Sequence, residues 1–189
     1  MECVILAAGS SSRLGMDKAL VDVGSQTLIS WISRRLSSRV ANITIVANES
    51  NFAEISKIVS DVNVILNRNP HEGRTGSLKV GIDSIDSSGV KDYRLLVVPV
   101  DRPGFSDSTL DHLICSEETC CPMKEGRGGH PLVLTFEDVD KVRRSSANSP
   151  LREVIEASRF EVLDRFLELN IDTPEDIINL QEKLQLVNE

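Results

Sequence analysis

Three short segments of the sequence carry side chains that could bind a nucleotide and a metal ion. The first runs from Ala7 to Lys18 and is rich in glycine and serine, with Arg13 and Lys18 as its cations. Small residues let backbone N–H groups approach a polyphosphate closely, and the two cations would offset its charge. The spacing of Gly9 and Gly15 fits neither the P-loop nor the dinucleotide-binding motif. An ordinary turn is the alternative, but two cations after an apolar run favour phosphate binding.

The second and third segments each supply a carboxylate. Asp101 follows the apolar run 95–98. Because Mg²⁺ takes one or two carboxylates together with phosphate oxygens and water, Asp101 is a suitable ligand beside a nucleotide. The residues alone equally allow Asp101 to cap a helix that begins near Ser106. Asp172 is a candidate second metal ligand, but the Thr173-Pro174-Glu175 run that follows it is also a favourable helix start.

The segments between these residues alternate between strand-like and helix-like patterns. Buried strands are predicted from apolar runs at residues 4–7, 43–47, 62–66 and 95–98. Helical spacing of apolar residues predicts helices between them, and this order implies a mostly parallel sheet with helices on both faces. In such sheets ligands bind beyond the carboxyl ends of the strands, where the loop after Ala7 and Asp101 would both lie. We therefore expect one α/β domain covering residues 1–189.

The pattern loosens after residue 115. Gly126, Gly128 and Gly129 predict a mobile loop. A short strand, two helices and a last strand are expected after it, at residues 132–134, 138–144, 151–158 and 160–163. Thr173, with Pro174 behind it, predicts the start of a final helix, whose first turn contains Glu175 and Asp176.

Composition excludes several classes of protein. The 189 residues are 40% apolar and 26% charged, as in folded globular proteins. A net charge of −8 and only 4% aromatic residues argue against nucleic-acid binding. No apolar run approaches the roughly 20 residues that cross a bilayer, so we expect a cytoplasmic protein without membrane contact. The cysteines lack paired C-x-x-C steps, which disfavours zinc, and Cys120-Cys121 is interpreted as the start of a strand.

Taken together, the motifs resemble those of the NTP-transferase family of molybdenum-cofactor maturation, whose members attach CMP or GMP to molybdopterin. The opening segment is similar to that family's signature over its full length, as Leu6-Ala7-Ala8-Gly9-x-Ser11-x-Arg13-Leu14-Gly15-x-x-Lys18. Four further matches follow in the family's order: Asn69-Pro70 with Gly73 and Gly76-Ser77-Leu78, Asp101-x-Pro103, Gly126-x-x-Gly129-His130-Pro131, and Ile171-Asp172-Thr173-Pro174-Glu175-Asp176.

The sequence departs from the family pattern at two places. Arg102 stands where the family usually has Gln, and residues 145–150 replace its Gly-Asp-x-Gly segment. The second departure affects the expected identity of the acceptor more than that of the nucleotide. Members with Ala8-Gly9 in the first motif tend to use CTP, whereas those with Gly-Gly tend to use GTP. The resemblance therefore favours CTP over GTP.

The resemblance implies a three-layer α/β/α domain with a Rossmann-like sheet of the nucleotide-diphospho-sugar transferase type. It implies Mg²⁺-dependent transfer of NMP from an NTP to a phosphorylated acceptor, molybdopterin, with release of pyrophosphate. Catalysis would depend on Arg13, Lys18 and Asp101, and Asp101 with Asp172 would bind the metal. The nucleotide-binding residues would be Leu6, Ala7, Ala8, Gly9, Ser11, Arg13, Gly15, Lys18, Asn69, Ser77 and Asp101. Gly129 and His130 would bind the acceptor, although composition alone favours a turn histidine.

Two other functions remain open from the sequence. A nucleotidyltransferase for a sugar phosphate or another small phosphate shares the first motif, but it usually has Pro where Asp17 stands. A nucleotide-binding accessory protein without turnover is the other alternative. The presence of Arg13, Lys18, Asp101 and Asp172 argues against it.

Overall fold

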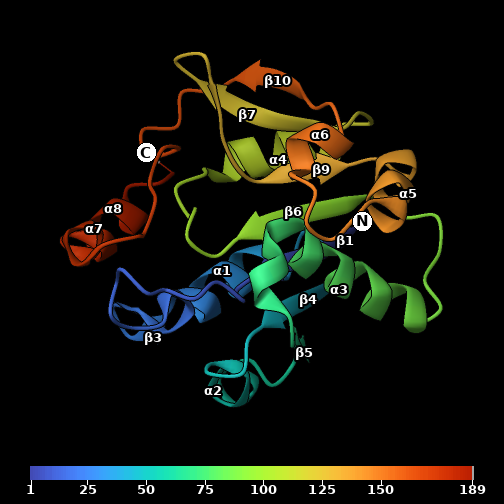
Figure 1. The fold of residues 1–189 in the computed structure, drawn as a ribbon. Helices are drawn as coiled ribbons and strands as arrows, with labels where there is room; N and C mark the ends of the chain where they lie inside the picture. The colour runs from blue at the N-terminus through green and yellow to red at the C-terminus, as the bar shows by residue number, and fades with distance from the viewer. Residues whose placement is uncertain (189) are drawn as a thin grey trace.

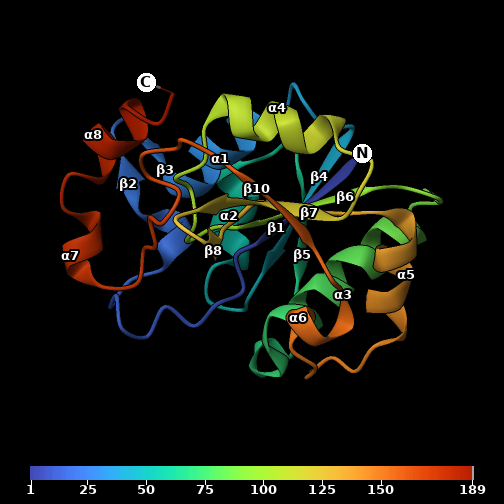
Figure 2. The same cartoon turned by 90° about the horizontal axis from the view of Figure 1, so that it is seen from above.

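The computed structural model describes residues 1–188, in which helices cover both faces of a central sheet (Figure 1, Figure 2). Within this part of the chain, eight strands form the sheet in the order β10-β7-β9-β6-β1-β4-β5, with β8 paired to β7. Their bounds are β1 Glu2–Leu6, β4 Asn42–Ala47, β5 Asn63–Leu66, β6 Leu95–Pro99, β7 Cys120–Lys124, β8 Arg127–Gly128, β9 Leu132–Leu134 and β10 Ser158–Glu161. The predicted three-layer α/β fold is confirmed.

The central strands are parallel, as predicted. Ile5 of β1 lies opposite Ile45 of β4 on one side and Val98 of β6 on the other. β9 is the exception, because it runs antiparallel to β6 with Leu132 opposite Val97. Consequently the beginning of β9, and not its end, lies at the edge where β1, β4 and β6 end.

The helices divide between the two faces of the sheet (Figure 2). On one face lie α1 Leu28–Leu36, α2 Phe52–Ile58, α4 Asp107–Cys115 and α8 Leu180–Gln185. The other face is covered by α3 Gly73–Ser87, α5 Phe136–Arg144 and α6 Leu151–Val154. The remaining short elements are η1 Lys18–Leu20, η2 Pro70–Glu72, α7 Pro174–Ile177 and the β2–β3 pair of Asp22–Val23 with Gln26–Thr27.

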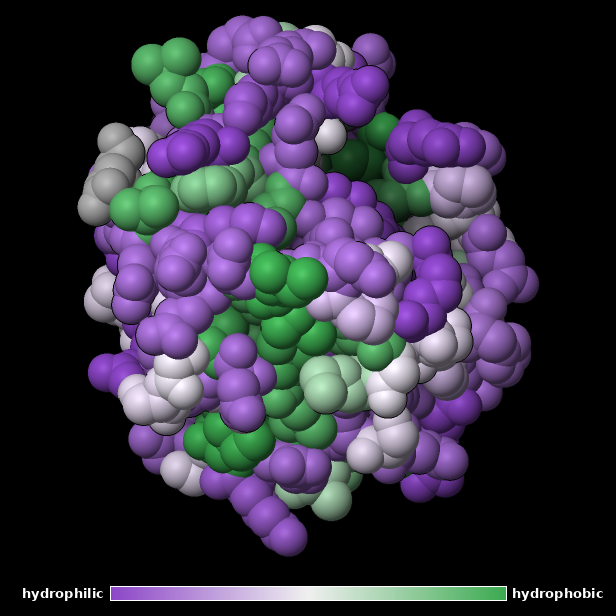
Figure 3. Space-filling model, turned by 90° about the vertical axis from the view of Figure 1, so that its left-hand side faces the viewer, coloured by the Kyte–Doolittle hydropathy of each residue, from purple (hydrophilic) through white to green (hydrophobic). Residues whose placement is uncertain are grey.

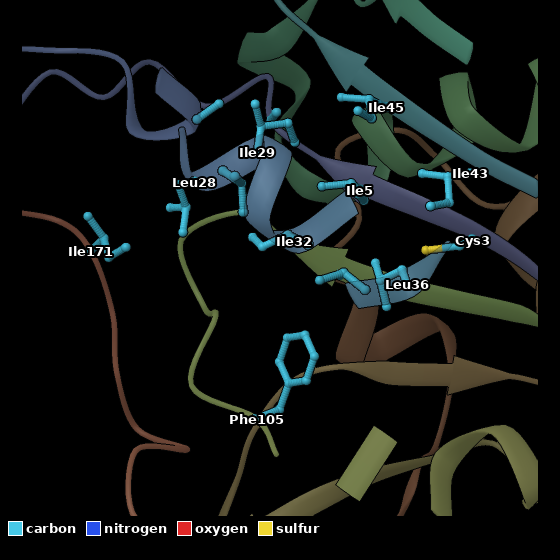
Figure 4. Close-up of a cluster of buried hydrophobic side chains, with 14 of the residues drawn as sticks. Cys3, Ile5, Leu28, Ile29, Ile32, Leu36, Ile43, Ile45, Phe105 and Ile171 are labelled. Atoms are coloured by element: carbon cyan, nitrogen blue, oxygen red, sulfur yellow. The ribbon is translucent and has the colours of Figure 1, made fainter. Parts of the chain in front are cut away.

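Side chains of β1 alternate between two hydrophobic cores. Cys3 and Ile5 pack with α1 on one face, and Figure 4 shows Cys3 near Leu36 and Ile5 on the side of Ile32. Val4 packs with α3 on the other face. Because both faces of β1 are buried, its fully apolar sequence is explained, and the loop that follows it begins from a rigid position.

Two glycines allow close packing near the site. A Cβ atom at Gly81 of α3 would lie 2.9 Å from the side chain of Val4 on β1. A Cβ atom at Gly104 would lie 1.8 Å from the backbone oxygen of Phe166. Gly104 therefore lets the segment after β6 contact the segment before Asp172.

We predict that Gly104→Ala lowers the free energy of unfolding by at least about 2 kcal/mol, because the added methyl meets a backbone oxygen that has little freedom to move. Urea denaturation followed by circular dichroism measures the change. Gly9→Ala is the control, since a Cβ there has no neighbour within 4 Å. Equal stability of Gly104→Ala and the unaltered protein would contradict the packing described.

Several predicted boundaries are wrong. The helix expected at 151–158 ends at Val154, and Ile155 is extended at φ −130° and ψ 152°. The helix ends early because the segment after it pairs with the edge of the sheet, where the Ser158 N–H donates to the Thr119 oxygen at 2.9 Å. The last strand therefore begins at Ser158 and ends at Glu161, two residues earlier than predicted.

Two further segments differ from expectation. The predicted mobile loop instead forms the β7–β8 hairpin, with Glu125 and Gly126 in left-handed conformations at its turn. The final helix begins after Thr173 as predicted, but it is divided into α7 and α8 at Asn179, where φ is +58°. Cys120 and Cys121 are buried in β7, as the sequence indicated. None of the helices in residues 1–188 has the length and apolar character that crossing a membrane requires.

Candidate active site

A polar pocket of about 420 Å³ lies at the carboxyl edge of the parallel strands. Its walls come from the loop after β1, the start of α3, the segment after β6, and Asn170 with Asp172. The predicted residues that line it are Leu6, Ala7, Ala8, Gly9, Ser11, Arg13, Lys18, Ser77, Asp101 and Asp172. Four predicted residues are not part of the lining, namely Gly15, Asn69, Gly129 and His130. Figure 3 shows the side of the molecule towards which β6 points, where hydrophilic side chains dominate the upper half and a hydrophobic patch lies below.

The loop after β1 adopts a compact conformation. Ser11 and Gly15 both have positive φ, at 48° and 77°. The Ser11 backbone oxygen accepts from the Leu14 N–H at 3.1 Å, and its hydroxyl accepts from the Lys18 N–H at 3.2 Å. The loop thus folds back on itself, which brings Lys18 to the wall of the pocket.

Buried asparagines after β4 hold this loop in place. Asn51 is fully buried, and its amide donates to the Ala7 oxygen at 2.9 Å and to the Asp17 carboxylate at 2.8 Å. Asn48 donates to the Gly9 oxygen at 3.1 Å. Asp17 also caps η1 by accepting from the Ala19 N–H at 2.9 Å. Sequence reasoning missed both asparagines and gave Asp17 no structural role.

We predict that Asn51→Ala lowers the free energy of unfolding by roughly 1–3 kcal/mol, because it leaves buried polar groups without partners. It should also weaken nucleotide binding, since the loop loses its anchor. Thermal unfolding and calorimetric titration with Mg-NTP measure the two effects. The control is Asn63→Ala, which removes an amide on the exposed side of β5. If Asn51→Ala changed neither quantity, the loop would not depend on this anchor.

Lys18 joins the two predicted metal ligands. Its ammonium nitrogen lies 2.9 Å from Asp172 Oδ1 and 3.5 Å from Asp101 Oδ2. Arg13 Nη1 lies 2.7 Å from Asp172 Oδ2, while Arg74 Nη2 lies 3.8 Å from Asp101 Oδ2. The side chains of Lys18, Asp101 and Asp172 are 13%, 17% and 19% exposed, so this cluster is shielded from most solvent. Residues from three distant segments therefore meet at one point.

Backbone and side-chain bonds fix Asp172. The Ile171 N–H donates to the Asp101 oxygen at 2.9 Å, and Asp176 accepts from the N–H groups of Asp172 and Thr173 at 2.9 and 2.7 Å. Asp176 therefore caps the start of the helix, as predicted. The Asp172 side chain takes no part in this cap and contacts Lys18 instead. A hydrogen bond from Lys18 lowers the pKa of the Asp172 carboxyl, so that it stays ionised.

The alternative role of Asp101 as a helix cap does not agree with the structure. Ser106 itself caps α4, because its hydroxyl accepts from the Thr109 N–H at 3.1 Å. Asp101 instead turns its carboxylate towards Lys18 and Arg74.

The two carboxylates fit a Mg²⁺ site that a nucleotide completes. The Asp101 and Asp172 carboxylates both face the Lys18 ammonium, so the two are placed to contact one bound cation together. Residues 1–188 contain no cluster of three or more His, Cys, Asp or Glu side chains that would hold a metal by themselves. Mg²⁺ is commonly held by one or two carboxylates plus substrate phosphates and water, which agrees with a pair.

Ser77 lines the pocket, but Asn69 does not. Ser77 Oγ accepts from the buried Asn67 amide at 3.0 Å and donates to the Gly73 oxygen. Asn69 is exposed and directly precedes η2, and its N–H donates to the Asn67 side chain at 2.8 Å. The buried contact with Ser77 therefore comes from Asn67, two residues before the one predicted to bind nucleotide.

His130 lies beside the pocket because β9 is antiparallel. The pairing of Leu132 with Val97 brings His130, just before β9, close to the end of β6 and hence to Asp101. Burial, with the nearby charges of Arg74 and Arg102, lowers the pKa of His130 to about 4. Its imidazole is therefore neutral at pH 7. Its Nδ1 atom is buried and has no hydrogen-bond partner within residues 1–188, and the same holds for Arg102 Nε.

The fold and this pocket together define a nucleotidyltransferase. The model of the MobA-like NTP transferase domain family matches residues 3–162, so the chain belongs to that family. The resemblance found in the motifs is thereby confirmed.

Named relatives agree with this assignment, and a solved structure shares the fold. A molybdenum cofactor guanylyltransferase of Vibrio atlanticus is 30% identical over 125 residues, which is 65% of this chain and 56% of that protein. A protein of the same name from Cereibacter sphaeroides is 25% identical over 193 residues, and the match covers 96% of each chain. A solved nucleotidyl transferase from Methanothermobacter has the same fold, with a TM-score of 0.76 and 20% identity over 99% of this chain and 98% of that one.

Proposed function

We propose that this protein transfers a nucleoside monophosphate from an NTP to the terminal phosphate of molybdopterin and releases pyrophosphate. The observation that carries the proposal is the meeting of Lys18 with Asp101 and Asp172 beside the loop after β1. This arrangement offers backbone donors and a cation to a triphosphate, and two carboxylates to Mg²⁺. The relatives are named molybdenum cofactor guanylyltransferases, which supports an acceptor of this cofactor class, and molybdopterin is the acceptor that the motif resemblance implies.

GTP is the nucleotide that we propose first, because the relatives are named guanylyltransferases. CTP, which the Ala8-Gly9 pair favoured, is the second candidate. Both nucleotides have the same triphosphate, so the pocket residues described above would serve either. Assays with both GTP and CTP therefore decide which nucleotide base the protein uses.

The proposed chemistry needs no strong general base. A phosphate nucleophile is ionised at neutral pH, so catalysis consists of orienting the two substrates and offsetting their charge. Backbone N–H groups of the loop would hold the triphosphate, and Arg13 with Lys18 would offset charge that develops on the leaving pyrophosphate. Asp101 and Asp172 would hold Mg²⁺, which supplies further charge neutralisation when bound.

A pyrophosphate-release assay with Mg²⁺ tests the proposal. Purified protein is supplied with GTP or CTP and with molybdopterin, a sugar 1-phosphate or no acceptor. We expect release with molybdopterin and one of the two nucleotides, and none when EDTA replaces Mg²⁺. Release with the sugar phosphate alone would make this a different nucleotidyltransferase. Binding of Mg-NTP without release with any acceptor would favour an accessory protein.

We also propose that the protein acts in the cytoplasm. Its four cysteines are free thiols, and three of them are buried. Free thiols fit a reducing compartment.

A further inference from the structure

We propose that Arg102 and Arg74, together with His130, form a second anion subsite that binds the phosphate of the acceptor. This subsite rests on the function proposed above and adds the residues that would receive the second substrate. Arg102 is the residue by which the chain departs from the family's Asp-Gln-Pro pattern, so the subsite is a feature of this sequence.

The charges that line the pocket are unbalanced. The lining contains four cations, Arg13, Lys18, Arg74 and Arg102, but only two anions, Asp101 and Asp172. Two positive charges therefore remain without a counter-charge in the pocket, although the whole chain has a net charge of −8. A concentration of positive charge in an acidic protein indicates an anionic ligand.

The cations fall into two groups according to the segments that carry them. Lys18 and Arg13 belong to the loop after β1 and both contact Asp172. Arg74 belongs to α3, and its nearest carboxylate contact is the 3.8 Å approach to Asp101. Within residues 1–188, Arg102 has no carboxylate oxygen within 4.0 Å of its guanidinium. The group formed by Arg74 and Arg102 is therefore available to a ligand.

Two buried polar atoms in the segments next to Asp101 have no partner. They are Arg102 Nε and His130 Nδ1, and no hydrogen-bond partner within residues 1–188 reaches either. Buried polar atoms are nearly always hydrogen-bonded in folded proteins. Arg102 follows β6 and His130 precedes β9, and the pairing of these two strands brings their segments together. Arg74 lines the same pocket as Arg102. A hydrogen-bonding anion is the ligand that suits them.

The chemistry of this group selects a phosphomonoester. A guanidinium presents a planar fork of N–H donors, which matches two oxygens of one phosphate. The neutral imidazole of His130 adds a ring nitrogen that can donate or accept a hydrogen bond. The loop after β1 already offers donors and cations to the triphosphate, so Arg74 and Arg102 on other segments are left for the incoming phosphate.

Phenyl phosphate, a minimal phosphomonoester, is the probe for this subsite. The protein is first saturated with Mg²⁺ and the α,β-methylene analogue of GTP or CTP, whichever binds more tightly, and is then titrated in a calorimeter. We expect Arg102→Gln to weaken phenyl phosphate binding by about ten-fold or more, since a charged hydrogen bond is lost. Affinity for the nucleotide analogue should stay within about two-fold. Arg102→Lys should restore part of the loss.

Arg144→Gln is the matched control, because Arg144 is exposed on α5 and pairs with Asp140 outside the pocket. Phenyl phosphate affinity that is unchanged in Arg102→Gln would overturn the subsite. Equal losses of nucleotide and phenyl phosphate affinity would also overturn it, since Arg102 would then serve the triphosphate. If the unaltered protein binds no nucleotide, the proposed function fails, and the same titration on the nucleotide-free protein still tests the subsite.

Discussion

Asp101→Asn is expected to lower the rate of pyrophosphate release by at least about a thousand-fold, with both substrates saturating. The substitution keeps the size of the side chain but removes the charge that faces Lys18 at 3.5 Å and Arg74 at 3.8 Å. It would also remove one of the two proposed metal ligands. The fold should survive, because the bond from the Ile171 N–H is made to the backbone oxygen of Asp101.

Pyrophosphate release and the melting temperature are measured together to separate chemistry from stability. Asp83→Asn on the exposed side of α3 is the control, and its rate should equal that of the unaltered protein. A melting temperature within a few degrees of the unaltered protein is expected for both variants. If Asp101→Asn kept its full rate, Asp101 would have no part in the metal site.

Lys18→Met should have the second largest effect, a loss of roughly a hundred- to a thousand-fold in the rate at saturation. Its ammonium contacts both Asp101 and Asp172, and in turnover we expect it to offset charge on the phosphates. Methionine keeps most of the length of the side chain. The Lys18 N–H bond to Ser11 Oγ is unaffected, so the loop should keep its conformation.

Single-turnover and steady-state rates of Lys18→Met with varied NTP measure both binding and chemistry. We expect a weaker NTP affinity together with the lower rate. Lys91→Met, in the exposed segment before β6, is the control and should change neither. A defect confined to acceptor binding would contradict the role assigned to Lys18.

The sequence predicted those parts of the site that depend on local pattern. The apolar run of β1 and the small residues after it indicated a phosphate loop, and the structure places Ala7, Arg13 and Lys18 in one pocket. Asp101 was placed at the same edge by topology alone, because the ends of parallel strands lie together. The roles of these residues in catalysis and in binding stay predictions.

Other parts were not predictable because they depend on contacts between distant segments. Asn51 gives no local signal, yet it holds the loop through the Ala7 oxygen. The position of His130 near Asp101 follows from the antiparallel pairing of β9, which the βα pattern did not suggest. The helix expected at 151–158 stopped early because β10 pairs with β7, and pairing outweighs the weak local preference of a short segment.

The bond between the Ile171 N–H and the Asp101 oxygen has a consequence for synthesis of the chain on the ribosome. Chains emerge from the amino end, so the loop after β1 and the Asp101 segment are made long before residue 172. A nascent chain that stops short of Asp172 holds the nucleotide loop but lacks half of the carboxylate pair and a partner of Lys18. Such a chain should bind nucleotide weakly and transfer none of it. The protein would therefore become active only after residue 172 has been translated.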